Sequence, residues 1–125
     1  MSAVIVRGAE APEFELPGVR FTALAAPSRG SAEVCTWRIT VAPDVDGQPH
    51  TLDRDEVFMV LSGQVRLGDG APVLGPGDAA VVPAGEPIAL TNAGDGPAEL
   101  YVAISAGFTA TMADGTPVGT PPWAT

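Results

Sequence analysis

The chain has 125 residues, of which fifteen are acidic and six basic, so its formal net charge at pH 7 is -9. A surface this acidic repels nucleic acid and anionic membranes, and neither is an expected partner. No apolar run approaches the roughly 20 residues needed to span a bilayer. The N-terminus lacks a basic start followed by a long apolar segment, so a cytoplasmic location is expected.

The composition predicts an all-β protein. With 15 Gly and 13 Pro but 46% hydrophobic residues, the chain is rich in turns without being polar enough to be disordered. A chain of this length forms one domain, here 1–125, with an N-terminal arm at 1–18 and a Pro-rich tail at 114–125. The single cysteine, Cys35, has no partner for an internal disulfide.

Alternating hydrophobic residues and turn residues predict the strands. Val4 to Val6 reads as a short edge strand. The further strands are expected at 20–26, 33–42, 56–61, 64–67, 71–74, 79–82, 88–91, 99–105 and 108–112. Proline lacks the ladder donor, so the tail is not a central strand, and Trp123 is expected to pack as a plug.

Two stretches carry the chemistry of the chain. The first, Gly47 to Gly63, contains the only histidine, His50, six residues before Glu56. The second, Gly77 to Asn92, is another apolar segment bracketed by Gly and Pro.

The spacing within these stretches resembles the paired motifs of the cupin superfamily. The first motif runs Gly, several residues, His-x-His, three or four residues, Glu, six residues, Gly. The second runs Gly, five residues, Pro-x-Gly, two residues, His, three residues, Asn. The matching positions are His50, Glu56, Gly63, Gly77, Pro83, Gly85 and Asn92. The resemblance implies a double-stranded β-helix, a jelly-roll-like barrel of mostly antiparallel strands.

The metal ligands that the resemblance implies are incomplete. A cupin metal is typically held by three His and one Glu, but the second and third histidine positions are here Leu52 and Ile88. His50 and Glu56 alone would hold a divalent metal weakly, so no cofactor is expected. Asp53 and Asp55 lie at alternate positions that should point away from the interior.

Two other side chains were considered as donors to a divergent metal site. Cys35 lies on the apolar face of its strand, and Tyr101 could reach inward from a late strand. A lone Cys on an apolar face is more often a small core residue than a ligand.

The same alternation predicts an apolar ligand pocket inside the barrel. Its expected lining is Cys35, Trp37, Leu52, Phe58, Val60, Ile88 and Leu90, with His50 and Glu56 as the polar groups. Such a pocket suits a small apolar or amphipathic molecule.

These residues support more than one function. A carboxylate near an imidazole in an apolar cavity can transfer a proton, so His50 and Glu56 are the candidate catalytic residues of a metal-independent isomerase, epimerase or cyclase. Alternatively, the two residues bind each other or backbone groups and have only a structural role. The alternative functions are a non-catalytic ligand-binding or sensing module and, less favoured, a divergent metal-dependent cupin such as a dioxygenase.

A homodimer is expected, partly by resemblance to small cupins. The second reason is the apolar segment Val4 to Val6, which could pair with an open sheet edge.

Overall fold

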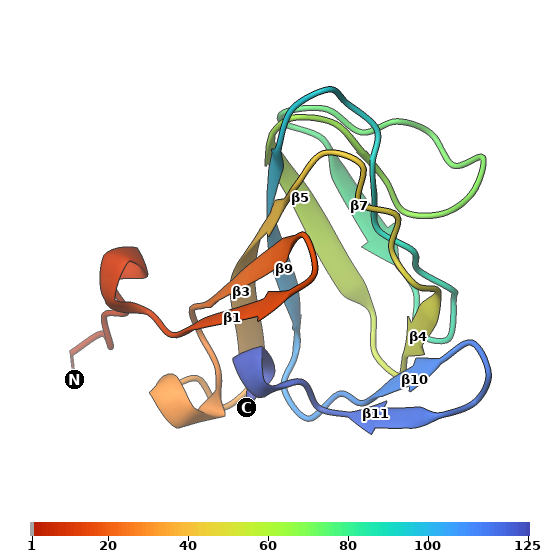
Figure 1. The fold of residues 1–125 in the computed structure, drawn as a ribbon. Helices are drawn as coiled ribbons and strands as arrows, with labels where there is room; N and C mark the ends of the chain where they lie inside the picture. Colours follow the sequence, from red (N-terminus) through yellow and green to blue (C-terminus); the bar gives the residue numbers. More distant parts are fainter. Residues whose placement is uncertain (1) are drawn as a thin grey trace.

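The computed structural model describes residues 2–125, which form an almost entirely β structure (Figure 1). The strands are β1 (Glu13–Leu16), β2 (Val19–Ala23), β3 (Val34–Val41), β4 (His50–Leu52), β5 (Glu56–Ser62), β6 (Val65–Arg66), β7 (Ala79–Val82), β8 (Thr91–Asn92), β9 (Ala98–Ser105), β10 (Ala110–Met112) and β11 (Pro117–Gly119). Three 3-10 turns accompany them: η1 (Gly8–Glu10), η2 (Pro27–Arg29) and η3 (Pro122–Ala124). The predicted all-β class is confirmed.

Antiparallel pairing arranges these strands in three sheets. The largest has the order β1-β2-β3-β9-β5-β7, the second β11-β10-β4, and the third β6-β8. Figure 1 shows the large sheet and the sheet of β4, β10 and β11 on different sides of the molecule. Within residues 2–125, no helix is long and apolar enough to cross a membrane.

The core lies on the inner face of the large sheet. In β3, alternate residues point inward, and each is paired in register with an inward residue of β9. These pairs are Cys35 with Ile104, Trp37 with Val102, Ile39 with Leu100 and Val41 with Ala98, and all eight side chains are buried. The period-2 pattern of the sequence thus becomes a continuous apolar layer.

The two motif stretches are joined to each other through their backbones. The Gly47 N–H donates to the Leu90 carbonyl over 2.9 Å. His50 and Ile88 exchange two backbone hydrogen bonds of 3.0 and 2.8 Å. We call this contact the motif seam. Glycine is required at position 47, because a Cβ there would lie 2.5 Å from the Leu90 oxygen.

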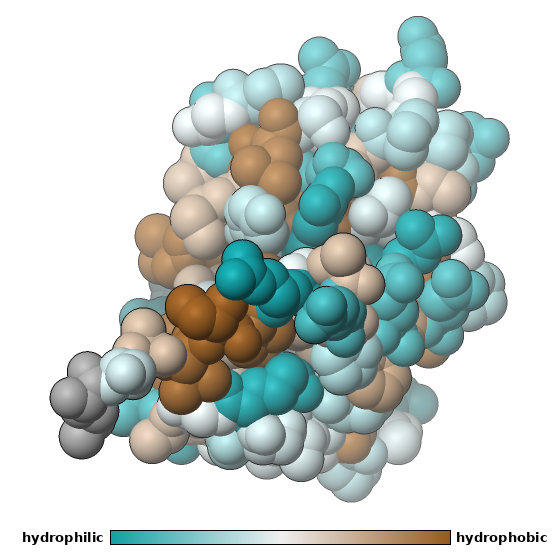
Figure 2. Space-filling model, turned by 90° about the vertical axis from the view of Figure 1, so that its left-hand side faces the viewer, coloured by the Kyte–Doolittle hydropathy of each residue, from teal (hydrophilic) through white to brown (hydrophobic). Residues whose placement is uncertain are grey.

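The N-terminal region differs from expectation in two ways. Val4 to Val6 is not a strand, and its side chains lie on a flank where hydrophobic residues gather (Figure 2). The expected arm is also shorter, because Glu13–Leu16 forms β1 in a hairpin with β2. Phe14, between two exposed glutamates, packs 6.4 Å from the Trp123 ring and fixes β1 at the sheet edge.

The C-terminal tail behaves as predicted. The Trp123 ring stacks on Phe21, with 3.7 Å between ring centroids and 7° between planes. Proline-containing β11 occupies an edge of its sheet. The carbonyl of Ala124, beside this plug, accepts a hydrogen bond from the Cys35 thiol at 3.4 Å.

Candidate functional site

Glu56 is a carboxyl group without a partner inside the barrel. It begins β5 between Val82 of β7 and Ile104 of β9, and it is only 3% exposed. Its Oε1 atom is buried and has no hydrogen-bond partner. This burial raises the pKa of Glu56 to about 8, because an isolated carboxylate is poorly solvated in an apolar interior. Glu56 is therefore mostly protonated at pH 7.

His50 is half-buried and belongs to β4. It lies on the same side of the strand as buried Leu52, with Met112 and Ile88 as its backbone neighbours. The Nδ1 atom lies 3.0 Å from the carbonyl oxygen of Gln48. Because a carbonyl only accepts hydrogen bonds, Nδ1 carries a hydrogen, and Nε2 of the neutral ring keeps its lone pair.

His50 and Glu56 form no hydrogen bond or ion pair with each other. The ion pairs found among residues 2–125 involve Arg20 and Arg38, and the side-chain hydrogen bond of His50 goes to a backbone carbonyl. Burial is accordingly the cause that shifts the pKa of Glu56. The structural alternative allowed each residue to bind either the other or a backbone group, and His50 binds a backbone carbonyl.

The residues expected to line a pocket are part of the packed core. Cys35, Trp37, Leu52, Phe58, Val60 and Ile88 are all buried, and Leu90 is a half-buried residue packed against them. Trp37 adds a polar atom without a partner, because its Nε1 is buried and makes no hydrogen bond. Tyr101, considered as an inward donor, instead points outward and is exposed.

The donors around the motifs do not fit a transition metal. Leu52 and Ile88 place hydrocarbon where the motif has histidine. The Asp53 carboxylate accepts hydrogen bonds from the Thr109 N–H and hydroxyl at 2.7 and 3.0 Å, and Asp55 accepts one from the Ala84 N–H. No group of three His, Cys, Asp or Glu side chains within the described chain is arranged to hold a metal ion.

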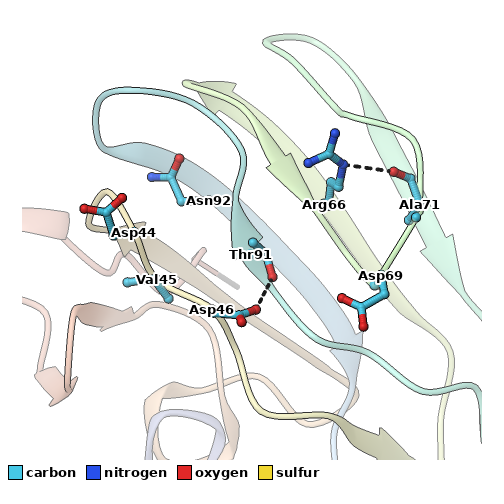
Figure 3. Close-up of a pocket in the computed structure, with 10 residues that line it drawn as sticks. Asp44, Val45, Asp46, Arg66, Asp69, Ala71, Thr91 and Asn92 are labelled. Carbon is cyan, nitrogen blue, oxygen red and sulfur yellow. Dashed lines mark hydrogen bonds between the residues drawn. The ribbon is translucent and has the colours of Figure 1, made fainter.

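The structure also contains a surface hollow that the sequence analysis missed. It has a volume of about 540 Å³, and its lining includes Asp44, Asp46 and Asp69 (Figure 3). The Thr91 hydroxyl donates to Asp46 over 3.0 Å, whereas the Arg66 side chain turns toward a backbone carbonyl and leaves the carboxylates unneutralised. Anions are therefore disfavoured here.

No sequence signal could have revealed this hollow. Asp44 and Asp46 lie in one loop and Asp69 in another, and they are brought together by the bridge between Asp46 and Thr91 and by the pairing of β6 with β8. None of the expected pocket residues lines it.

Comparison with known protein families shows which family the chain belongs to. The profile of the cupin domain matches residues 37–104, which include both motif stretches. The chain therefore belongs to the cupin family. No curated protein matches its sequence.

Solved structures with the same fold include enzymes. The polyketide cyclase RemF from Streptomyces resistomycificus has a TM-score of 0.73 at 18% identity, with 83% of this chain and 80% of that chain covered. A cupin sugar phosphate isomerase from Silicibacter pomeroyi has a TM-score of 0.65 at 24% identity, covering 78% and 67%. An RmlC-like cupin from Ralstonia eutropha has a TM-score of 0.78 at 9% identity, covering 98% and 81%. These likenesses establish the fold.

Proposed function

We propose that this cupin is a metal-independent isomerase, epimerase or cyclase that moves a proton on a small uncharged molecule. The observation that carries the proposal is Glu56, a carboxyl group that is buried, has an unpartnered oxygen and titrates near neutral pH. A buried polar group without a hydrogen bond costs about 1–3 kcal/mol. A bound ligand that supplies the missing hydrogen bond would recover that cost.

In this proposal the two proton carriers act from different sides of the substrate. Nε2 of His50 takes a proton from a carbon next to a carbonyl group, while the protonated Glu56 donates its proton to the carbonyl oxygen, giving an enol. In the second half of the reaction the enol oxygen returns its proton to Glu56, and His50 returns its proton to carbon. Protonation of a different carbon, or of the other face of the same carbon, gives the isomer. Because no hydrogen bond or ion pair joins His50 to Glu56, each group is free to act on the substrate by itself.

The polar atoms of the interior favour an uncharged ligand. Glu56 is mostly neutral at pH 7, and the indole N–H of Trp37 is a neutral donor without an acceptor. The surroundings are hydrocarbon side chains such as Phe58 and Ile88. Neither a cation nor an anion would be stabilised there, so we propose a small, amphipathic carbonyl compound.

The solved structures add general support. RemF is a polyketide cyclase and the Silicibacter pomeroyi protein is a sugar phosphate isomerase. Both are cupin folds with activities in the classes proposed here. The absence of a suitable metal donor set among residues 2–125 supports chemistry by side chains alone.

The experiment that tests the proposal follows proton exchange directly. Uncharged carbonyl compounds are incubated with the protein in D₂O, and loss of the C–H signal is followed by NMR. We expect catalysed exchange with the parent and a loss of at least about 100-fold for Glu56→Gln and His50→Ala. Glu33→Gln, which removes an exposed carboxylate outside the candidate site, is the control and keeps the parent rate.

Two other outcomes would favour the alternative functions, a binding module or a metal-dependent enzyme. A binding or sensing module would be identified by a ligand that raises the melting temperature equally in the parent and the variants and undergoes no proton exchange in any of them. Stoichiometric metal in protein purified without chelators, together with activity lost in EDTA, would contradict the metal-independent mechanism.

A further inference from the structure

The C-terminal segment 120–125 lies beside the buried candidate site. Glu56 is only 3% exposed, so a ligand can reach it only after a part of the structure moves. Cys35 of β3 lies in one row with Ile104 of β9 and Glu56 of β5, because these residues are register partners. The Cys35 thiol donates its hydrogen bond to the Ala124 carbonyl. The segment therefore contacts the row that contains Glu56, two strand spacings or about 10 Å away from that residue.

Few polar contacts hold this segment in place against β1, β2 and β3 (Figure 1). Within residues 2–125, three hydrogen bonds join 121–125 to the rest of the protein: from the Ser28 N–H to the Thr125 oxygen at 3.1 Å, from the Arg29 guanidinium to the Trp123 carbonyl at 3.2 Å, and from the Cys35 thiol to the Ala124 carbonyl at 3.4 Å. A thiol is a weak donor. The Thr120 hydroxyl, by contrast, donates to the Phe108 carbonyl over 2.6 Å. Residue 120 is thus the fixed end about which 121–125 can turn.

The indole of Trp123 fills a space between aromatic rings without satisfying their polar atoms. It stacks on Phe21 with 7° between the planes, and it meets Trp37 at 63° with 6.5 Å between centroids. We call the space between Phe21 and Trp37 the aromatic slot. The Nε1 atoms of Trp37 and Trp123 are both buried without a hydrogen-bond partner. Because an indole N–H only donates, neither ring can accept the hydrogen bond of the other.

We propose that 121–125 is a gate of the barrel interior, and that Trp123 holds in the closed protein the place of a planar aromatic ligand with an oxygen acceptor. Opening uncovers Cys35 and Trp37, and the ligand ring then replaces the indole in the aromatic slot. Its oxygen accepts the hydrogen bond of Trp37, which Trp123 cannot do. The inference rests on the interior binding site of the proposed function but not on its proton transfer, so opening and binding are the quantities to measure.

Labelling of the single native cysteine measures the opening. Methyl methanethiosulfonate modifies buried Cys35 only when the gate has moved away, and mass spectrometry gives the rate. Arg29→Gln removes one of the three hydrogen bonds that hold the gate. We expect labelling at least about 10-fold faster than in the parent, at a rate that hardly changes with low concentrations of urea, as for a local opening.

Arg54→Gln is the matched control for the labelling. Arg54 also donates to a backbone carbonyl, that of Ala106, which lies outside the gate. This variant should label at the parent rate. Equal rates in Arg29→Gln and Arg54→Gln, or labelling that occurs only through global unfolding, would overturn the gate.

Matched ring compounds test the aromatic slot. Indanone and indane have the same fused rings, but only indanone carries a carbonyl oxygen. In Trp123→Ala, which empties the slot, we expect calorimetry to give a dissociation constant at least about 10-fold lower for indanone than for indane. Trp123→Ala/Trp37→Phe should bind the two compounds equally. Trp123→Leu, which keeps a smaller apolar side chain, repeats the comparison in a less destabilised protein.

The binding results are distinct from those of the proton-exchange experiment. Equal affinity for indanone and indane in both Trp123→Ala and Trp123→Leu would overturn the aromatic slot, even if the parent catalyses exchange. Preference for indanone that depends on Trp37, without catalysed exchange in the parent, would support the slot and contradict only the proposed enzyme.

Discussion

The buried carboxyl of Glu56 makes stability depend on pH in a direction opposite to that of a salt-bridged carboxylate. The pKa of Glu56 is about 8 in the folded state against an ordinary 4.5, so the folded protein binds more protons than the unfolded chain between these values. The contribution of the group to the free energy of unfolding is present below pH 4.5, falls as the pH rises to 8, and is level above it.

Glu56→Gln should remove this dependence. The amide is isosteric and cannot ionise, so the variant should gain stability relative to the parent as the pH rises from 5 to 8. Each unit of pKa shift corresponds to about 1.4 kcal/mol, giving a total change of several kcal/mol. Urea unfolding at a series of pH values measures this, with Glu33→Gln as the exposed control. Parallel pH profiles for parent and Glu56→Gln would contradict the burial of an unpartnered carboxyl.

Hydrocarbon side chains stand at positions 52 and 88, where the cupin motif has histidine. Ile88 is the backbone partner of His50, and Leu52 lies two residues further along the same side of β4. In Leu52→His/Ile88→His, three imidazoles and Glu56 would converge. We expect a lower melting temperature without metal, because polar rings enter the core, and a rise on adding Zn²⁺. A melting temperature unchanged by zinc would disprove this convergence.

Among the elements, the C-terminal turn η3 closes the barrel through a single aromatic side chain. Trp123 stacks on Phe21 and lies 6.5 Å from Trp37. Trp123→Ala should lower the free energy of unfolding by about 3 kcal/mol. Val118→Ala in neighbouring β11, which is exposed, should change it by less than about 0.5 kcal/mol. Thermal unfolding followed by circular dichroism compares the two variants; equal effects would show that the tail is not a plug.

The elements with strong alternation were predictable from the sequence, and those set by tertiary pairing were not. The pattern of Cys35, Trp37, Ile39 and Val41 gave β3 nearly to its ends. By contrast, the expected strand at 71–74 is reduced to a single bridge between Val65 and Leu74. Short segments of this kind become strands only when a partner in register is available, which depends on the whole fold.

The inward position of Glu56 was predictable from the sequence, but the hydrogen bonding of His50 was not. The motif spacing identified His50 and Glu56, and alternation placed Glu56 on the inner face. Whether the two side chains meet is decided by the orientation of the imidazole toward the Gln48 carbonyl. No periodicity in the sequence carries that information.

At the scale of the whole molecule, the net charge of -9 governs how the homodimer expected from the sequence should respond to salt. Two like-charged copies repel each other. Added salt screens the repulsion, so the dissociation constant should fall as ionic strength rises. Sedimentation over a series of NaCl concentrations measures this. A dimer that salt weakens would point to a contact made by opposite charges.

The motif seam holds the two motif stretches together through backbone groups, so the fold there does not depend on which side chains supply the chemistry. It is made by backbone groups, including the hydrogen bonds between His50 and Ile88 and the bond from Gly85 N–H to the Leu52 carbonyl. Backbone hydrogen bonds remain when the side chains of the bonded residues are replaced. Histidine can therefore be replaced by leucine or isoleucine at positions 52 and 88 without loss of the barrel. New reactions can thus arise by substitution at a few seam positions, while the fold still requires glycine at position 47.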